Sequence, residues 1–200
     1  MKDLLFPTTI HWYDNVLEKE YIDSMVEYLE TKGNEKIKFG KNWQSKPDIH
    51  KHNKFKVLTD KVLELSKIYF DDMNWIYNDY DITDMWGTVS PTHHYHRPHT
   101  HSNNILSGVY YLKSDEQANI IFADPRQQAH VLEPKVKEWQ LNNAPNWNYP
   151  STVNRLILFP SYMVHHVPVN TSNQNRISVA FNVMLKGKVG ESIEYQSAEF

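Results

Sequence analysis

The pattern of apolar and polar positions divides the chain into a helical first part and a strand-rich second part. Apolar residues recur at helical spacing within residues 16–31 and again within residues 54–70. Residues 34–52, between these two segments, are polar and are predicted to form a loop. We therefore expect two amphipathic helices to flank the structure that the rest of the chain forms.

From Trp75 onward, the chain contains short runs of β-branched and aromatic residues separated by turn signals. The predicted strands cover residues 76–89, 105–112, 118–122, 130–133, 136–141, 153–159, 164–169 and 176–185. Several short strands without alternating helices favour a sandwich or barrel over a βαβ fold. We predict a mainly β, jelly-roll-like domain over residues 1–200, with a helical flank (1–75) packed outside a β core (76–187).

Composition and charge exclude several classes of function. Lys and Arg total 21, Asp and Glu total 24, and the net charge is −3, so no basic field favours nucleic-acid binding. No apolar run approaches the ~18 residues of a membrane span, and the N-terminus does not resemble a signal peptide. We expect a cytoplasmic protein. The sequence has no cysteine, so a transition metal would need His, Asp or Glu ligands.

Histidines supply the strongest chemical signal. Five of the 11 histidines lie within residues 93–101, immediately before a predicted strand. His99 and His101 are two residues apart, so on an extended segment they point to the same side and can bind one ion. Neutral imidazole is a good ligand for iron, zinc and copper. The alternative is a solvated histidine-rich loop, and we assign His93, His94 and His96 to the loop or to the rim of a pocket.

A third ligand can come from a distant segment. His165 and His166 are adjacent, so on a strand their side chains face opposite ways and one of the two can be a ligand.

An arginine follows the second histidine segment. Arg176 offers a rigid, charged fork that suits a carboxylate, and Ser178 shares its strand face and adds a hydroxyl donor. The alternative is an edge-strand arginine in a surface salt bridge. Asp124 and Arg126 follow another predicted strand and could form only a turn, or could place a carboxylate and an anion-binding group near the site.

Together these motifs resemble the 2-oxoglutarate- and iron(II)-dependent oxygenases. HTHSNNILSGVYYL, IIFADPR, LILFPSYMVHHVPVN and RISVAFN occur in the family's order, and LFPTTIHWYDNVL resembles the start of a branch common in marine bacteria and their phages. The resemblance implies a double-stranded β-helix with iron at one mouth. It also implies that His99 and His166 bind the metal, and that Arg176 and Ser178 bind the far carboxylate of 2-oxoglutarate. His166 is preferred to His165 because its His-Val-Pro-x-Asn run matches the family.

One position departs from the family pattern. Most members carry Asp or Glu two residues after the first histidine, and this chain has His101 there. Either three histidines hold the iron, or two do and His101 lies behind them. We predict the ligand set His99, His101 and His166. Trp86, Tyr110 and Tyr111 are expected to line the pocket.

The predicted activity is a 2-oxoglutarate-dependent dioxygenase, a hydroxylase that uses O2 and, in vitro, ascorbate as reductant. Its substrate is a small molecule or a protein side chain, and residues 34–52 and 127–150 are candidates for the substrate rim. One alternative is a cupin-like metalloprotein, an isomerase or a cofactor-independent dioxygenase, although the glutamate usual after a cupin His-x-His is missing. Another is a binding module with a structural zinc, which would need His96 or Asp124 as a fourth ligand.

Overall fold

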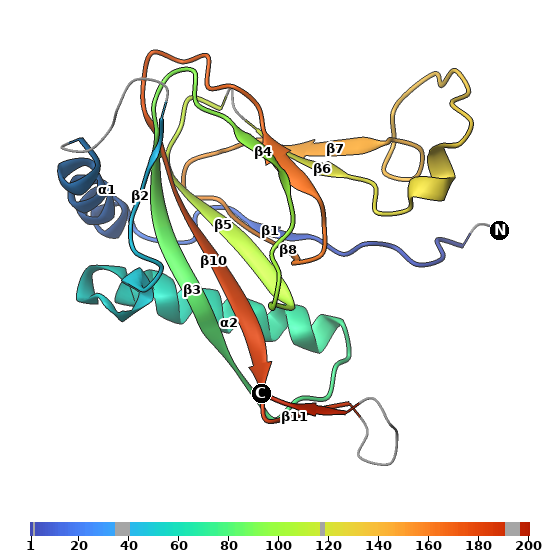
Figure 1. The fold of residues 1–200 in the computed structure, drawn as a ribbon, viewed down its shortest axis with the longest axis horizontal. Helices are drawn as coiled ribbons and strands as arrows, with labels where there is room; N and C mark the ends of the chain where they lie inside the picture. Colours follow the sequence, from blue (N-terminus) through green and yellow to red (C-terminus); the bar gives the residue numbers. More distant parts are fainter. Residues whose placement is uncertain (2, 35–40, 117–118, 191–196) are drawn as a thin grey trace.

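The computed structural model describes residues 1, 3–34, 41–116, 119–190 and 197–200. Two α-helices lie in the first part of the chain, as the apolar spacing predicts (Figure 1). They are α1 (Lys19–Asn34) and α2 (Lys56–Asp72), accompanied by the 3-10 helices η1 (Ile49–Lys51), η2 (Asn53–Phe55) and η3 (Gln127–His130). Among the described residues, no helix combines the length and apolar character needed to cross a bilayer.

Six antiparallel strands form the larger sheet, which we call the major sheet. Its order is β1 (His11–Tyr13), β8 (Leu156–Pro160), β5 (Leu106–Lys113), β10 (Arg176–Lys186), β3 (Asp79–Ser90) and β2 (Trp43–Gln44). The long strand β10 lies at its centre, paired with β3 on one side and β5 on the other.

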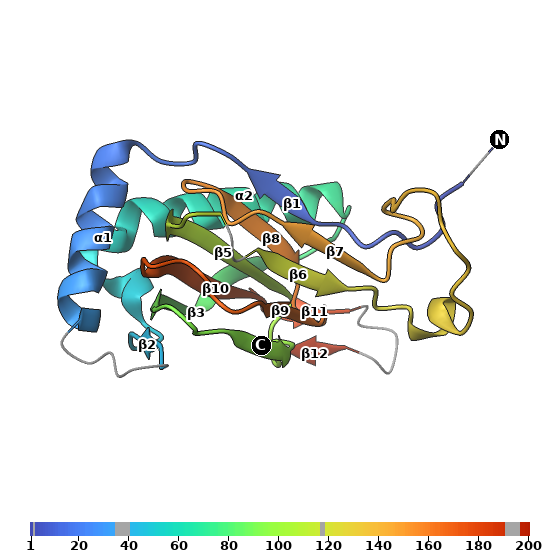
Figure 2. The ribbon, with the colours of Figure 1, turned by 90° about the horizontal axis from the view of Figure 1, so that it is seen from above.

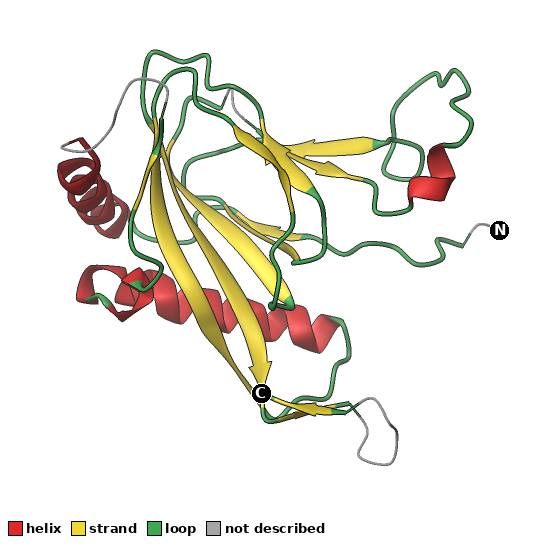
Figure 3. Cartoon of the chain, in the orientation of Figure 1, coloured by secondary structure: helices red, strands yellow, loops and turns green. Residues whose placement is uncertain are grey.

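Four strands form the minor sheet, in the order β4 (His96–His99), β9 (His165–Val167), β6 (Ile120–Ala123) and β7 (Asn146–Tyr149). A separate pair, β11 (Lys188–Val189) and β12 (Ala198–Glu199), lies beyond the end of β10. Figure 3 shows the two helices on one side of the strands, and Figure 2 shows α2 running along the major sheet.

Alternation along β10 gives the major sheet two different faces. Ile177, Val179 and Phe181 pack in a core that also contains residues of α1 and α2. Arg176 and Ser178, which alternate with them, line a cavity on the opposite face. One face of the sheet is therefore structural, and the other is available for chemistry.

A glycine allows the helical layer to approach closely. A Cβ atom at Gly87 of β3 would collide with the Leu29 side chain of α1, so a larger residue there would push the helix away from the sheet.

A second, smaller core fills part of the space between the sheets. It contains Val109 and Ile157 from the major sheet and Ile120 and Phe122 from the minor sheet. The sequence-based prediction of a mainly β sandwich with helices outside is confirmed.

The structure corrects several strand predictions. Residues 130–133 and 136–141 form no strand, and η3 and irregular chain occupy this region. Val131 and Leu132 are apolar, yet they are 79% and 81% exposed, so they lack the burial that makes an apolar run a strand. Residues 124–145, which we call the arm, project beyond the ends of β6 and β7 (Figures 1 and 2).

Several short strands lie where no strand was predicted. Among the described residues they are β1, β2, β4, β7, β11 and β12. The first two belong to the segment expected to be only a helical flank, and they form the two edges of the major sheet.

Candidate functional site

A cavity lies between the two sheets. The major sheet contributes Trp86, Tyr111, Arg176 and Ser178 to its lining, and the minor sheet contributes the side chains of β4 and β9 that face inward. These β4 and β9 residues are His96, His99, His165 and Val167, and His101 joins them from the connection after β4.

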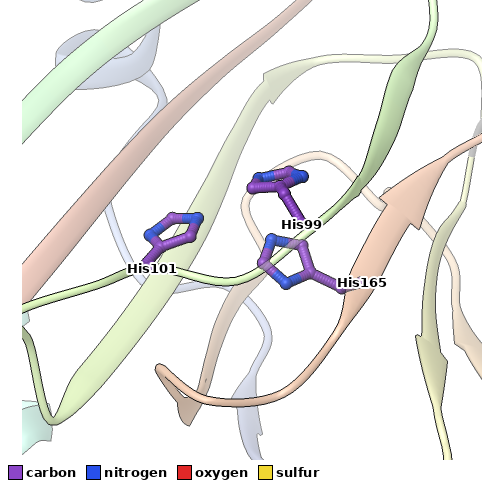
Figure 4. Close-up of side chains that lie close together, drawn as sticks. All are labelled: His99, His101 and His165. Carbon is purple, nitrogen blue, oxygen red and sulfur yellow. The ribbon is translucent and has the colours of Figure 1, made fainter.

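Three histidines come together at one end of this cavity. His99 ends β4, His101 follows two residues later, and His165 opens β9, directly opposite His99 in the register of the minor sheet. Their ligand nitrogens lie within 4.8 Å of one another. The ring centroids are 4.4 Å apart for His99 and His165, 5.1 Å for His101 and His165, and 5.3 Å for His99 and His101 (Figure 4).

Hydrogen bonds define which nitrogen of each ring is available. The Nδ1 atom of His99 donates to the Arg97 carbonyl oxygen at 2.7 Å, and that of His165 donates to the Met163 carbonyl oxygen at 3.0 Å. The Nδ1 atom of His101 donates to the Asn182 side-chain oxygen at 2.5 Å. Because a carbonyl oxygen only accepts, each Nδ1 carries the proton and each Nε2 keeps its lone pair for a ligand.

Burial keeps two of these imidazoles uncharged. It is the main cause that lowers the pKa of His101, and it lowers the pKa of His165 to about 3. A metal ion requires the neutral ring, so at pH 7 these side chains already have the protonation state of a ligand. The donor set fits a divalent transition metal with open coordination positions.

The third histidine is not the predicted one. His165 is 5% exposed and belongs to the group, whereas the adjacent His166 is only partly buried and does not line the cavity described here. On β9 the two side chains face opposite ways. We therefore replace His166 by His165 in the candidate ligand set.

The pattern of burial in the structure distinguishes these two histidines. Ser161, Met163 and His165 are buried, and the intervening Tyr162 and Val164 are exposed. This alternation of burial continues to His165 as the inward residue, and the residue types of this segment alone do not reveal it.

Arg176 occupies another part of the cavity wall. It begins β10 and is 4% exposed, which excludes the surface arginine that the sequence left open. Burial lowers the pKa of Arg176, and its interactions with Tyr111 and Asp115 oppose that shift. Ser178 lies two residues further along the same face. A buried guanidinium beside a hydroxyl suits the carboxylate of a ligand that enters the cavity.

A fourth histidine, His96, lines the same cavity. Burial lowers its pKa to about 3, with further contributions from His94, Arg176, His99 and His165. These contributions show that His96 lies near both Arg176 and two of the grouped histidines. The sequence placed this residue in a loop or at a rim, but it belongs to β4 and lines the cavity.

The predicted aromatic lining is partly corrected. Trp86 and Tyr111 line the cavity, and the Trp86 ring lies 5.9 Å from that of His101. Tyr110 instead belongs to the helix-side core, and its hydroxyl donates to the Asn154 side-chain oxygen at 2.7 Å. Neighbouring residues of a strand face opposite ways, so Tyr110 and Tyr111 cannot both face the cavity.

Asp124 and Arg126 interact with each other outside the cavity lining described here. Two bonds join the Arg126 guanidinium to the Asp124 carboxylate, at 3.0 and 2.8 Å, and His130 adds a third contact at 3.0 Å. The hydrogen bond from Arg126 is the main cause that lowers the pKa of Asp124 to about 2. These residues fasten the base of the arm.

A buried polar group behind His101 was missed from the sequence. Asn182, Ser107 and Ser161 belong to it. Asn182 shares the strand face of Arg176 and Ser178, so a polar residue at that spacing was the available signal.

Comparisons with known proteins agree with this geometry. A protein-family model for 2OG-Fe(II) oxygenases matches residues 84–182. The search of curated proteins finds no match. The solved structures include SnoN, a non-heme alpha ketoglutarate dependent epimerase from nogalamycin biosynthesis, with a TM-score of 0.65 and 11% identity over 88% of this chain and 76% of its own.

Two other solved structures are similar to the same extent. A prolyl-4-hydroxylase from Pseudomonas putida has a TM-score of 0.62 and 12% identity, covering 90% of this chain and 89% of its own. HygX from Streptomyces hygroscopicus has a TM-score of 0.61 and 11% identity, covering 88% and 83%. These similarities establish the double-stranded β-helix fold, and the family match runs from β3 to β10 across the three histidines and the buried arginine. The chain therefore belongs to the 2-oxoglutarate- and Fe(II)-dependent oxygenases.

Proposed function

We propose that His99, His101 and His165 hold Fe(II), and that 2-oxoglutarate lies between this ion and Arg176 with Ser178. The single observation that carries the proposal is the convergence of three imidazole groups at one end of a cavity whose wall also holds a buried guanidinium. HygX, which has a similar fold, has been crystallised with nickel and 2-oxoglutarate bound. That structure supports the proposal that this fold can hold a metal ion and 2-oxoglutarate together.

The bound cofactors supply activation of O2 coupled to oxidative decarboxylation of 2-oxoglutarate to succinate and CO2. The chain holds and orients them. Arg176 and Ser178 fix the far carboxylate, and the three imidazoles leave the remaining metal positions open. Trp86 and Phe159, both in the cavity lining, exclude water from the reacting groups.

We propose hydroxylation as the reaction. One oxygen atom of O2 enters succinate and the other replaces a C–H hydrogen of the substrate as a hydroxyl group. Hydroxylation needs no side chain that donates a hydrogen atom to the substrate. The similar structures include a prolyl-4-hydroxylase and an epimerase, so the mass of the product distinguishes the two outcomes. We also propose that the chain acts in the cytoplasm and belongs to the marine-bacterial and phage branch that its motifs resemble.

The direct test measures succinate formed from labelled 2-oxoglutarate with Fe(II), ascorbate and O2, over a panel of amino-acid, peptide and small-metabolite substrates. We expect slow turnover without substrate, faster turnover with the right one, and a gain of one oxygen atom in the product. Absence of succinate under all of these conditions would contradict the proposal.

A cupin-like metalloprotein is distinguished by ligand binding. Because a ligand that binds the folded state raises the melting temperature, 2-oxoglutarate should stabilise the metal-loaded protein. The cupin-like alternative predicts no such shift.

A further inference from the structure

The three candidate ligands are oriented in two different ways. His99 and His165 each donate to a backbone carbonyl oxygen two residues earlier in their own segment. His101 donates instead to the side chain of Asn182, which lies 81 residues away on the central strand β10. The orientation of His101 alone therefore depends on a side chain that can be substituted.

Asn182 is itself held in place by neighbouring strands. The Ser107 hydroxyl donates to the same Asn182 oxygen at 2.8 Å and lies 2.7 Å from the Ser161 hydroxyl. Asn182 and Ser107 face each other in the register of β10 and β5. All three side chains are buried, so water does not compete for these hydrogen bonds.

The backbone completes the connection to His101. Its N–H donates to the Ser161 carbonyl oxygen at 2.9 Å, and the Ser161 N–H donates to the Ile105 carbonyl oxygen at 3.1 Å. Ser161 thus contacts the backbone of His101 while its hydroxyl reaches the group that holds the ring. Both the position and the rotation of His101 are therefore set by strands β5 and β10 of the major sheet and by the residues that flank β5 and β8.

We propose that Asn182 is a positioning residue for the metal site, which holds His101 in the tautomer that directs Nε2 toward the ion. An acceptor behind a histidine ligand fixes the ring orientation and raises its basicity, and losing such a partner typically lowers metal affinity about 10–100-fold. Asn182 acts through His101 and touches neither the metal nor 2-oxoglutarate.

The test compares Asn182→Leu with Asn182→Asp. Leu removes the acceptor at similar size, whereas Asp keeps an acceptor at the same place. We expect the dissociation constant for Co(II), measured on metal-free protein by competition with a chelator, to rise about 10–100-fold in Asn182→Leu. In Asn182→Asp it should stay within about 3-fold of wild type or fall, because a carboxylate is the stronger acceptor.

Phe181→Leu is the matched control. Phe181 directly precedes Asn182 on β10 and packs in the helix-side core, so its truncation lowers stability without touching His101. We expect a lower melting temperature and an unchanged Co(II) affinity. Equal affinities of wild type and Asn182→Leu would overturn the role of Asn182 while leaving the proposed function intact.

A second readout needs neither a metal nor a variant. The role of Asn182 rests on the metal site proposed above, but the tautomer of His101 can be measured without a metal. Proton–nitrogen correlation spectra of metal-free protein with labelled histidine report which ring nitrogen carries the proton. We expect the proton of His101 on Nδ1. A proton on Nε2 in the wild type would overturn the inference, and failure of the wild type to bind any divalent metal would overturn the proposed function.

Discussion

At the scale of single residues, the proposed ligand set changes the charge of the site, because His101 stands where most family members carry a carboxylate. Three neutral imidazoles leave a divalent ion with its full charge of +2, one unit more than a site with one carboxylate. 2-Oxoglutarate carries two negative charges, and in the proposed binding mode it contacts both this ion and Arg176. We therefore expect metal and 2-oxoglutarate to strengthen each other's binding, since such coupling is reciprocal.

Exchanging each of the two adjacent histidines for alanine tests the corrected ligand. His165→Ala removes a ring that lies 4.4 Å from that of His99, so Fe(II)-dependent succinate formation should fall to background and Co(II) affinity should fall at least about 10-fold. His166→Ala changes the next residue of the same strand, on the opposite face. This variant should retain both succinate formation and Co(II) affinity. The reverse result would restore His166 as the ligand.

Replacing Arg176 tests the anchor of 2-oxoglutarate. Arg176→Gln keeps polar atoms but removes the charge and the fork. Loss of two charge-assisted hydrogen bonds, worth about 2–4 kcal/mol, should raise the dissociation constant for 2-oxoglutarate roughly 30–1000-fold by calorimetry.

Ser178→Ala serves as the graded comparison for Arg176→Gln. It removes one hydroxyl and should raise the same constant only about 5-fold. An unchanged constant in Arg176→Gln would show that the dicarboxylate binds elsewhere.

The sequence identified most of these residues but not the side of the strand that each side chain faces. His99, His101, Arg176 and Ser178 were identified from spacing and motif order, and the structure places all four in one cavity lining. The motif match favoured His166, whereas the structure groups His165 with His99 and His101, because the facing of two adjacent residues depends on burial that the sequence does not show. Asn182 was missed because its role depends on a contact across 81 residues.

At the scale of elements, the arm is the region where the strands predicted from the sequence are absent from the structure. Its apolar residues were taken as two strands, although they remain exposed. β1 and β2 have three and two residues, so they are too short to show an alternating pattern, and they are strands only because they pair with β8 and β3. The long strands β3, β5 and β10 were predicted well because their runs of β-branched and aromatic residues are visible in the sequence itself.

The base of the arm makes a prediction about acid stability. The pKa of Asp124 is about 2 in the folded chain and near its ordinary value of 3.8 when unfolded, so its stabilisation is present above pH 4 and is lost as pH falls toward 2. Asp124→Asn should lower the free energy of unfolding by about 1 kcal/mol at pH 7 in urea titrations. The difference from wild type should vanish near pH 2.

Asp23→Asn provides the control for the Asp124 substitution. Asp23 pairs with Lys19 on the exposed face of α1, and such pairs contribute at most about 0.5 kcal/mol. A cost as large as that of Asp124→Asn would mean that general charge effects, and not the base of the arm, dominate.

At the scale of the whole molecule, the site connects the two sheets. His99 and His165 belong to the minor sheet, while His101 is held from β10 and β5 of the major sheet. An ion bound by all three therefore links the two layers at one end of the cavity. The resemblance of the motif order to the family implied that a histidine near residue 99 and one near residue 165 meet. The structure brings these segments, more than sixty residues apart in the sequence, together.

Metal removal should accordingly lower the stability of the entire domain. A ligand at 100 times its dissociation constant adds about 2.7 kcal/mol, which corresponds to roughly 5–10 °C in melting temperature for a chain of this size. We expect chelator-treated protein to melt that much lower by calorimetry and to recover on addition of Mn(II). His99→Ala should show no recovery, and an equal gain in that variant would place the ion elsewhere.

The most direct measurement is a crystal structure of the protein with Mn(II) and N-oxalylglycine, an unreactive analogue of 2-oxoglutarate, using the anomalous signal of manganese. We expect a single strong peak bonded to Nε2 of His99, His101 and His165, with the far carboxylate of the analogue on the guanidinium of Arg176. A peak bonded to His166, or an analogue whose carboxylate points away from Arg176, would contradict the proposed site.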